Sequence, residues 1–351
     1  MACDFLTKSI THQTSTHKKR LLLSLFAGTA VLLAAVSCFT TEIVQDETPV
    51  EIAFNAVANP ATKADPELSG LSLGTDNEYV IYVAASADGS PKYFDPAATS
   101  YGGQLFAYFT DGAKWFPASG SPYTKQHIYW PFGGVKVDFL AYALTPKAKT
   151  KLSPTFHSDT HAREFTIADW DTFANQYDVL YAVANGCVPG ADGNVALAFK
   201  HAQALIAFTA KKTATTTVDL TINKITIKDL EYAGTLKVDN YRANLKASWT
   251  ISAHGDKDLA AAEGISDFPY TLNSTATQIT TNLLIPEQSS KQIVINYSMG
   301  GKAFDYELNI PRTNWEMGKK YTFNLEFSAA EITLEPTVAT WTEIVDNEQI
   351  G

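Results

Sequence analysis

Two histidines stand four residues apart in the stretch HSDTH, at positions 157 and 161. On a helix this spacing places both rings on one face, where they could bind a metal ion. A zinc protease of that kind also needs the glutamate of HExxH, which is missing here, and the stretch is polar and preceded by a proline. We therefore interpret HSDTH as a solvated loop and expect neither a metal site nor a cofactor.

The other candidates for chemistry have equally little support. Cys187 lies among turn-forming residues without a recognisable histidine partner, so a structural thiol is the better interpretation. Asp192 in PGADGN could be half of a calcium loop, but the alternating ligands are missing and a plain turn fits better. The sequence contains neither a P-loop nor GxGxxG. These patterns predict a protein that is not an enzyme.

Another cysteine, Cys38, follows a segment with the layout of an export signal. A basic cluster at 18–20 precedes an apolar run over 21–36, which is shorter than the ~20 residues that span a bilayer. The sequence AVSC resembles the lipobox of bacterial lipoproteins, in which the cysteine thiol receives a diacylglyceryl group and becomes the first mature residue. The resemblance implies a lipoprotein signal peptide over 1–37 and lipidation of Cys38. Ordinary signal cleavage, with Cys38 incidental, is the alternative.

Composition limits the class of protein. A chain of 351 residues favours two domains, and 45% hydrophobic with 18% charged residues is typical of a globular protein. The net charge of -10 excludes an electrostatic grip on nucleic acid. Three scattered cysteines are too few for a disulfide framework.

Downstream of the signal, apolar residues recur with a period of two, which predicts strands that are buried on one face. Gly- and Pro-rich turns separate the strands, as in an all-β sandwich, and NGCVPGADGN at 185–194 is the expected domain boundary. Short helices are plausible at IADWDTFAN and DLAAAEGI. The predicted strands cover 78–84, 104–109, 135–142, 195–200, 218–230, 292–297, 303–310 and 321–327.

Six tryptophans could either stack on sugars or close the ends of sandwich cores. We favour the core interpretation. The six are Trp115, Trp130, Trp170, Trp249, Trp315 and Trp341.

The order of several motifs resembles the fimbrillin family, the lipoprotein-derived type V pilins of anaerobic Gram-negative bacteria. The motifs are IYWPFGGVKVDFLAY, QYDVLYA, VALAFKHAQALIAFTA, LLIPEQ and NWEMGKKYTFNLEFSAAEITLEPTVATW. The resemblance implies an all-β chain with two transthyretin-like β-sandwich domains in tandem, at 64–193 and 194–351. It also implies a pilus subunit at the cell surface that supports adhesion, reaches the outer membrane as a lipoprotein precursor and binds other fimbrial subunits.

The resemblance gives the segment before the first domain a role. In the family a protease cuts after a basic residue, and the preceding strand leaves a groove that another chain must refill. Here that implies a propeptide over 38–63, a cut between Lys63 and Ala64 and a protease of trypsin-like specificity. The family usually has arginine at the cut. The strand that would leave lies within PVEIAFNAVA and carries alternating apolar residues, Val50, Ile52, Phe54 and Ala56.

A donor strand for such a groove is expected in EITLEPTVATWTEIVDNEQIG, residues 331–351. Pro336 suggests a bend between two short strands. The apolar positions are Ile332, Leu334, Val338, Trp341, Ile344 and Val345. The alternative is that the segment up to Trp341 completes the chain's own sandwich.

Two other classes of protein remain possible. A surface glycan-binding lipoprotein with a β-sandwich fold would present coplanar aromatic rings at one loop end, facing a host or bacterial surface ligand. A hydrolase on the same scaffold would need paired carboxylates converging in a cleft, which spacing in sequence does not reveal.

Overall fold

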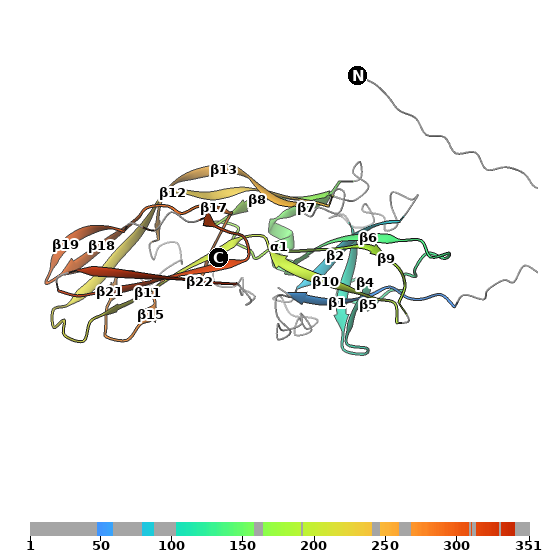
Figure 1. Cartoon of the computed structure of the whole chain (residues 1–351), viewed down its shortest axis with the longest axis horizontal. Helices are drawn as coiled ribbons and strands as arrows, with labels where there is room; N and C mark the ends of the chain where they lie inside the picture. Colours follow the sequence, from blue (N-terminus) through green and yellow to red (C-terminus); the bar gives the residue numbers. More distant parts are fainter. Residues whose placement is uncertain are drawn as a thin grey trace, which may run out of the picture. The chain divides into compact units, whose positions relative to one another are not determined.

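The computed structural model describes residues 48–58, 79–87, 103–157, 164–190, 192–240, 246–259, 268–308, 310, 314–329 and 331–340. Almost every described element is a strand, and the one helix among them is α1 (Pro146–Lys151) (Figure 1). The predicted all-β class is therefore confirmed. Within these ranges no helix has the length and apolar character needed to cross a membrane.

The first sheet almost closes on itself. Its strand order is β1-β10-β9-β6-β2-β3-β4-β5, and β1 also pairs with β4, so the two ends of the series meet. The strands are β1 (Ala53–Ala58), β2 (Val80–Ala87), β3 (Gln104–Phe109), β4 (Lys114–Ser119), β5 (Thr124–Lys125), β6 (Val137–Leu144), β9 (Leu180–Cys187) and β10 (Asn194–His201).

The second half of the chain forms two larger sheets and a two-stranded one. One sheet contains β11 (Ala204–Lys212), β15 (Thr277–Gln278), β16 (Leu283–Ile285), β21 (Lys319–Phe327) and β22 (Ile332–Thr340). The next contains β7 (Ser153–Phe156), β8 (Glu164–Asp171), β12 (Leu220–Asp239), β13 (Lys246–Leu259), β14 (Tyr270–Thr271), β18 (Ile293–Met299) and β19 (Lys302–Leu308). The pair is β17 (Gln288–Ser289) with β20 (Asn314–Trp315).

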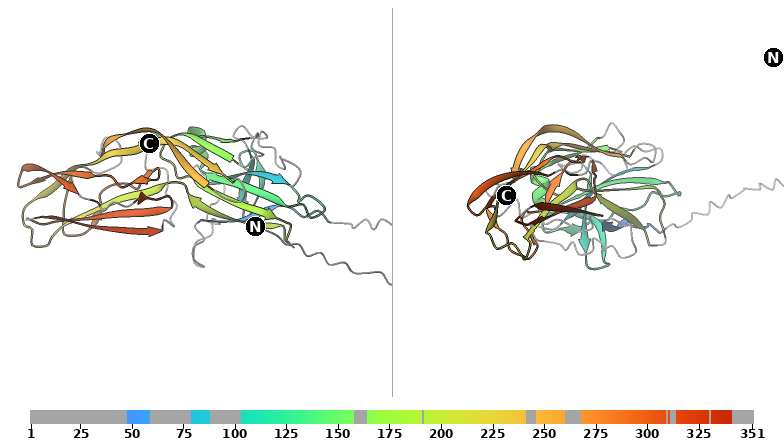
Figure 2. Two further views of the ribbon diagram at one scale, coloured as in Figure 1. Left: turned by 45° about the horizontal axis from the view of Figure 1, so that its top comes forward. Right: turned by 60° about the vertical axis from the view of Figure 1, so that its left-hand side comes forward.

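The two larger sheets enclose one apolar cluster. Inward side chains of β11 and β21, such as Phe208 and Phe323, share it with Ile222 of β12 and Ile295 of β18. These sheets are therefore the two layers of a sandwich. A separate cluster, which includes Phe54, lies inside the first sheet. In Figures 1 and 2, β12 and β13 run side by side as a long ribbon.

Only Ala202 and Gln203 separate β10 from β11, and this connection is buried. Beside it, His201 Nδ1 lies 2.9 Å from Asp178 Oδ1, and both side chains are fully buried. The Gln203 amide donates to the Tyr177 carbonyl oxygen at 3.0 Å, and its oxygen accepts from the Val179 N–H at 3.2 Å. The end of β10 is thus held in place by buried polar contacts.

The eight predicted strands are confirmed as strands. Most ends shift by up to three residues, but the strand predicted at 218–230 continues nine residues further, to Asp239. The helix predicted at IADWDTFAN is wrong, because β8 continues to Asp171 and a turn follows. Alternate residues Phe165 and Ile167 are buried there, which is strand periodicity. The division at 193/194 stays a prediction. Strand β8, which precedes this position, pairs with β12, which follows it, so one sheet contains strands from both sides of the division.

Candidate functional site

Strand β1 fills the gap between two strands of the first sheet. It runs parallel to β10, from Ala53 opposite Asn194 to Ala58 opposite Phe199. On its other side, it pairs with β4 in antiparallel orientation, with Phe54 opposite Trp115. Because both flanking strands use it, this segment is an internal strand although it lies at the N-terminal end of the described chain.

The inward face of β1 is apolar and fully covered. Ile52 and Phe54 are completely buried and Ala56 nearly so, while Val50 packs against the same cluster from a half-buried position. The Phe54 ring meets Phe106 edge-on at 4.6 Å between centroids and Phe139 at 5.2 Å. A strand with this packing contributes several kcal/mol, at roughly 1.5–3 kcal/mol for each large apolar side chain.

A second set of contacts surrounds the residues that lead into β1. The Ile52 N–H donates to the Ile128 carbonyl oxygen at 2.8 Å, and the Trp130 N–H donates to the Val50 oxygen at 2.9 Å. The Glu51 carboxylate lies 2.8 Å from His127 Nδ1 and 3.3 Å from Lys125 Nζ. We call the residues 125–130 together with Gly193 the mouth.

Gly193 lets the backbone of this strand pass at close range. Its φ is +69°, and a Cβ built on it would lie 2.1 Å from the Glu51 carbonyl oxygen. The Gly193 oxygen in turn accepts from the Ala53 N–H at 3.4 Å and from the Trp130 indole at 3.1 Å. Any larger residue at 193 would collide with the strand.

The mouth lies at a defined end of the first sheet. Strand β10 begins at Asn194 beside it and ends at His201, next to the buried connection to β11. Since β1 is parallel to β10, its first residues lie at the end away from that connection. An open hollow of about 420 Å³ adjoins the mouth there. Its lining includes Thr48, Val50, Trp130, Pro131, Phe132 and Pro189.

The other predicted strand of interest, β22, is an edge strand. It pairs antiparallel with β21, from Ile332 opposite Phe327 to Thr340 opposite Lys319, and the two lie side by side in Figure 1. Ile332 is buried and Leu334 half-buried against the core, but residues 335–340 are all exposed, with Val338 at 58%. Most of β22 is thus held by backbone hydrogen bonds rather than by burial.

The end of β22 that follows β21 also has a defined position. Strand β21 begins where the Gly318 N–H donates to the Gln203 oxygen, close to the β10–β11 connection. It runs parallel to β11 and ends with Phe327 opposite Lys212. The turn from 328 to 331, which links β21 to β22, therefore lies at the end of this sheet away from the connection.

The sequence profile of the fimbrillin-like family matches residues 74–341. This chain belongs to the fimbrillin-like family. A comparison with the curated proteins found no match.

Solved structures support the fold of this fimbrillin-like chain. A fimbrial protein from Bacteroides vulgatus is 14% identical with a TM-score of 0.55, over 83% of this chain and 99% of the other. A candidate cell adhesion protein from Bacteroides uniformis is 16% identical with a TM-score of 0.52, over 84% and 99%. A candidate cell adhesion protein from Bacteroides ovatus is 20% identical with a TM-score of 0.50, over 86% of this chain and 99% of the other. At such identities, the likeness concerns the fold alone.

The structure brings together only part of the predicted site. Val50, Ile52, Phe54 and Ala56 meet in and beside β1, and Ile332, Leu334 and Val338 lie on β22. The contacts of Glu51 with Lys125 and His127 were not predicted, because the partners are 74 and 76 residues away in sequence. The remaining predicted residues lie outside the described ranges: Cys38, Lys63, Ala64, Trp341, Ile344 and Val345.

Catalytic candidates gain little in this fimbrillin-like chain. His157 Nε2 lies 3.1 Å from Thr166 Oγ1, and His161 is outside the described ranges. No group of three metal-ligating side chains occurs in the described part. Burial, followed by the charge of Asp138, raises the pKa of the Cys187 thiol, which disfavours a reactive thiolate. A serine in GLSLG at 70–74 matches the GxSxG pattern that sequence reasoning overlooked, and it also falls outside the described residues.

The tryptophans follow the core interpretation where they are described. The side chains of Trp115, Trp130, Trp170 and Trp315 are buried. Trp249 is half-buried and lies 5.2 Å from Trp170 between ring centroids.

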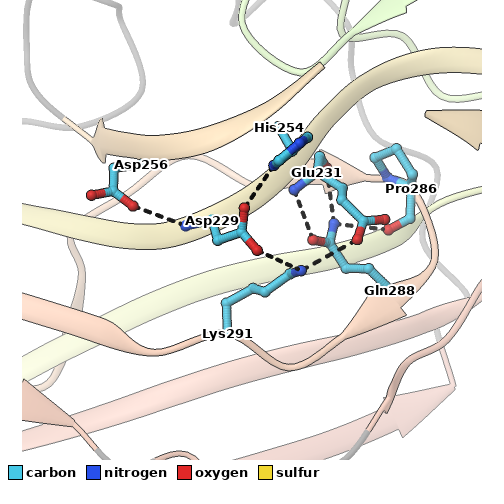
Figure 3. A network of polar contacts seen from close by, with 7 residues as sticks. All are labelled: Asp229, Glu231, His254, Asp256, Pro286, Gln288 and Lys291. Atoms are coloured by element: carbon cyan, nitrogen blue, oxygen red, sulfur yellow. Dashed lines mark hydrogen bonds and ion pairs between the residues drawn. The ribbon is translucent and has the colours of Figure 1, made fainter. Parts of the chain in front are cut away.

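A polar network lies on the β12–β13 ribbon. Asp229 has a φ of +49° and accepts from His254 at 2.7 Å, while its own N–H donates to Asp256 (Figure 3). Lys291 reaches between Asp229 and Glu231, at 3.9 and 3.3 Å. The His254 hydrogen bond and then the Lys291 charge lower the pKa of Asp229. Because these contacts coincide with a register shift between β12 and β13, they stabilise a bulge rather than form an active site.

Proposed function

We propose that this chain is a structural subunit of a cell-surface fimbria that supports adhesion, and that it is not an enzyme. It would be exported as a lipoprotein, cut after Lys63, and assembled when a strand of another subunit replaces β1. Membership in the fimbrillin-like family supports the first part. The observation that carries the second is the position of β1 as an internal strand between β10 and β4.

The physical argument starts from what remains when β1 leaves. The edges of β10 and β4 would lose backbone partners, and the space now filled by Ile52 and Phe54 would open to water. Both changes are unfavourable, so the first sheet would bind an extended apolar strand from another chain. While β1 is in place, the same edges are satisfied and the precursor has no such tendency.

Strand β22 supports the donor side of the proposal. Its departure would uncover few apolar side chains, since only Ile332 and Leu334 contact the core. The turn at 328–331 lies at one free end of its sheet and the mouth at the free end of the first sheet. A strand swung outward about that turn would therefore point toward the mouth of the next subunit in a linear series.

The test uses purified full-length precursor and limited trypsin digestion, followed by unboiled gel electrophoresis. Cut protein should form ladders that resist dilution, because several apolar side chains and a strand ladder hold each junction. Uncut protein and Lys63→Ala treated with the same protease should stay monomeric. Ladders from uncut Lys63→Ala would remove the strand-exchange proposal and leave the β fold untouched.

One observation favours a second candidate, a surface glycan-binding lipoprotein. Tyr129 of the mouth is 45% exposed, and Phe132, three residues further along the chain, is 62% exposed. The His127 and Tyr129 rings are nearly parallel, at 13°. A glycan array probed with the precursor and with Tyr129→Ala would separate the two: binding lost in the variant supports the glycan role.

A further inference from the structure

Two segments of the chain share a pattern that extends beyond alternation. Residues 51–58 are EIAFNAVA and residues 331–338 are EITLEPTV. In both, a glutamate precedes an isoleucine, and a large apolar residue follows two positions later. The isoleucine and the large residue face a core in each case. They are Ile52, just before β1, with Phe54 in β1, and Ile332 with Leu334 in β22.

Building on the strand exchange proposed above, we propose that the replacing strand is β22 of a second copy, parallel to β10, with Glu331 in the place of Glu51. Lys125 and His127 at the mouth then recognise the glutamate that precedes the first buried residue of the incoming strand. They act as specificity determinants for a second copy of this chain.

Lys125 and His127 at the mouth share one acidic partner. Lys125 and His127 both face the Glu51 carboxylate, whose side chain is only 24% exposed. Lys114, another lysine of this region, already has an acidic partner, because its Nζ lies 4.0 Å from Asp192 Oδ2. When β1 leaves, Glu51 leaves with it, and Lys125 and His127 both lose the carboxylate that they contact. Glu331, exposed at the start of β22, restores that partner only in this register.

The backbone geometry accepts Pro336 in this register, where it replaces Ala56. The Ile52 N–H points to Ile128, whereas the Ala53 N–H points to Gly193 just before β10. Because successive N–H groups of a strand alternate in direction, the N–H of Ala56 points away from β10. Beyond Phe54 no β1–β4 pair follows in the described chain, so a proline at this position forfeits no ladder hydrogen bond.

The difference in burial between the two sites favours the transfer of β22 from its own sheet to the site of β1. On its own sheet, β22 buries Ile332 and half-buries Leu334, and residues 335–340 remain exposed. In the site of β1, the equivalent positions 52, 53, 54 and 56 are all buried. The same eight residues therefore cover more apolar surface in the site of β1 than at their own sheet edge.

The test is a cross-linking experiment on the full-length chain that carries Cys3→Ser, Cys38→Ser and Cys187→Ser. Asn55 lies opposite Ala196, both side chains are exposed, and in the proposed register Glu335 takes the place of Asn55. Ala196→Cys combined with Glu335→Cys should give disulfide-linked chains only after the cut. Asn55→Cys with Ala196→Cys, within one uncut chain, is the geometric control.

Three further partners for Ala196→Cys identify the wrong registers. Linkage to Thr333→Cys or Thr337→Cys would mean a slip by two residues, and linkage to Asn347→Cys would mean that the tail beyond β22 is the donor. Each result overturns this register while strand exchange stands. Ladders without any of these links would show that the groove of β1 is not the junction, and the absence of ladders contradicts the proposed function itself.

A charge exchange tests the recognition of the glutamate. Glu331→Lys should slow ladder formation about fivefold, the effect of about 1 kcal/mol that a partly exposed ion pair can contribute. Adding Lys125→Glu should restore the rate. Glu335→Lys makes the same charge change four residues further along the strand, away from the mouth, and should alter the rate less than twofold. Equal slowing by Glu335→Lys, or no rescue, would remove Lys125 as a determinant.

Discussion

Glu51 crosses directly over Gly193, so closely that a Cβ at Gly193 would lie 2.1 Å from the Glu51 carbonyl oxygen. The two residues are far apart in sequence, and they meet because β1 runs parallel to β10, which begins at Asn194. The missing side chain at 193 is thus a condition for seating any strand in this position.

Gly193→Ala should weaken the seating of β1 more than its backbone strain explains. Gly186 has a similar φ of +63° but has no atom within 4 Å of the position of its Cβ, so Gly186→Ala reports the strain alone, about 1–2 kcal/mol. We expect a clearly larger loss for Gly193→Ala in urea unfolding of the precursor. Hydrogen exchange at Ile52 should rise only in the 193 variant; equal losses in the two variants would contradict the close approach.

Phe54→Ala should destabilise the precursor by about 3–5 kcal/mol, since it empties a fully buried site between Phe106 and Phe139. The neighbouring Asn55 is exposed, and Asn55→Ala should change the free energy of unfolding by less than about 0.5 kcal/mol. Both values come from urea titration. A small effect at Phe54 would mean that β1 contributes little to the first sheet.

The buried contact between Asp178 and His201 should be worth more than a surface pair. Asp178→Ala removes a carboxylate that is fully buried and 2.9 Å from the His201 ring. A loss of at least about 1–3 kcal/mol is expected in the free energy of unfolding. The double variant Asp178→Ala/His201→Ala completes a cycle, and a coupling energy near zero would show that the contact is not energetically significant.

Lys149 should make the free energy of unfolding depend on pH in the alkaline range. Burial lowers the pKa of its ammonium group from 10.5 to about 8. Between these values the unfolded chain binds more protons than the folded one, so stability should rise as the pH increases through this window. Lys149→Met should remove that part of the rise, about 1–2 kcal/mol after solvent screening. The exposed Lys151→Met is the control and should leave the slope unchanged.

The lipoprotein part of the proposal has a direct chemical test. The diacyl group would attach through the Cys38 sulfur, so Cys38→Ser should abolish incorporation of labelled palmitate and leave the precursor unprocessed. Cys187→Ser should be labelled like the wild type. Normal maturation of Cys38→Ser would favour ordinary signal cleavage.

The sequence by itself determined the class of fold and part of the strands. Tyr321, Phe323, Leu325 and Phe327 alternate with polar residues, and this period of two is dictated by the pleat wherever one face is buried. The same rule identified the strand within 49–58. It failed at IADWDTFAN, where Ile167, Trp170 and Phe173 recur every three residues and so also fit a helix. The pairing of β8 with β12 decided the outcome.

Only the tertiary structure decided which strands are neighbours. Alternation shows that Ile52 and Phe54 face a core, but a period of two is the same for parallel and antiparallel partners, at an edge or inside a sheet. The parallel pairing with β10, the contact of Glu51 with Lys125 and His127, and the need for glycine at 193 all join residues more than 70 positions apart. Such contacts depend on how the sheet closes, which no local pattern encodes.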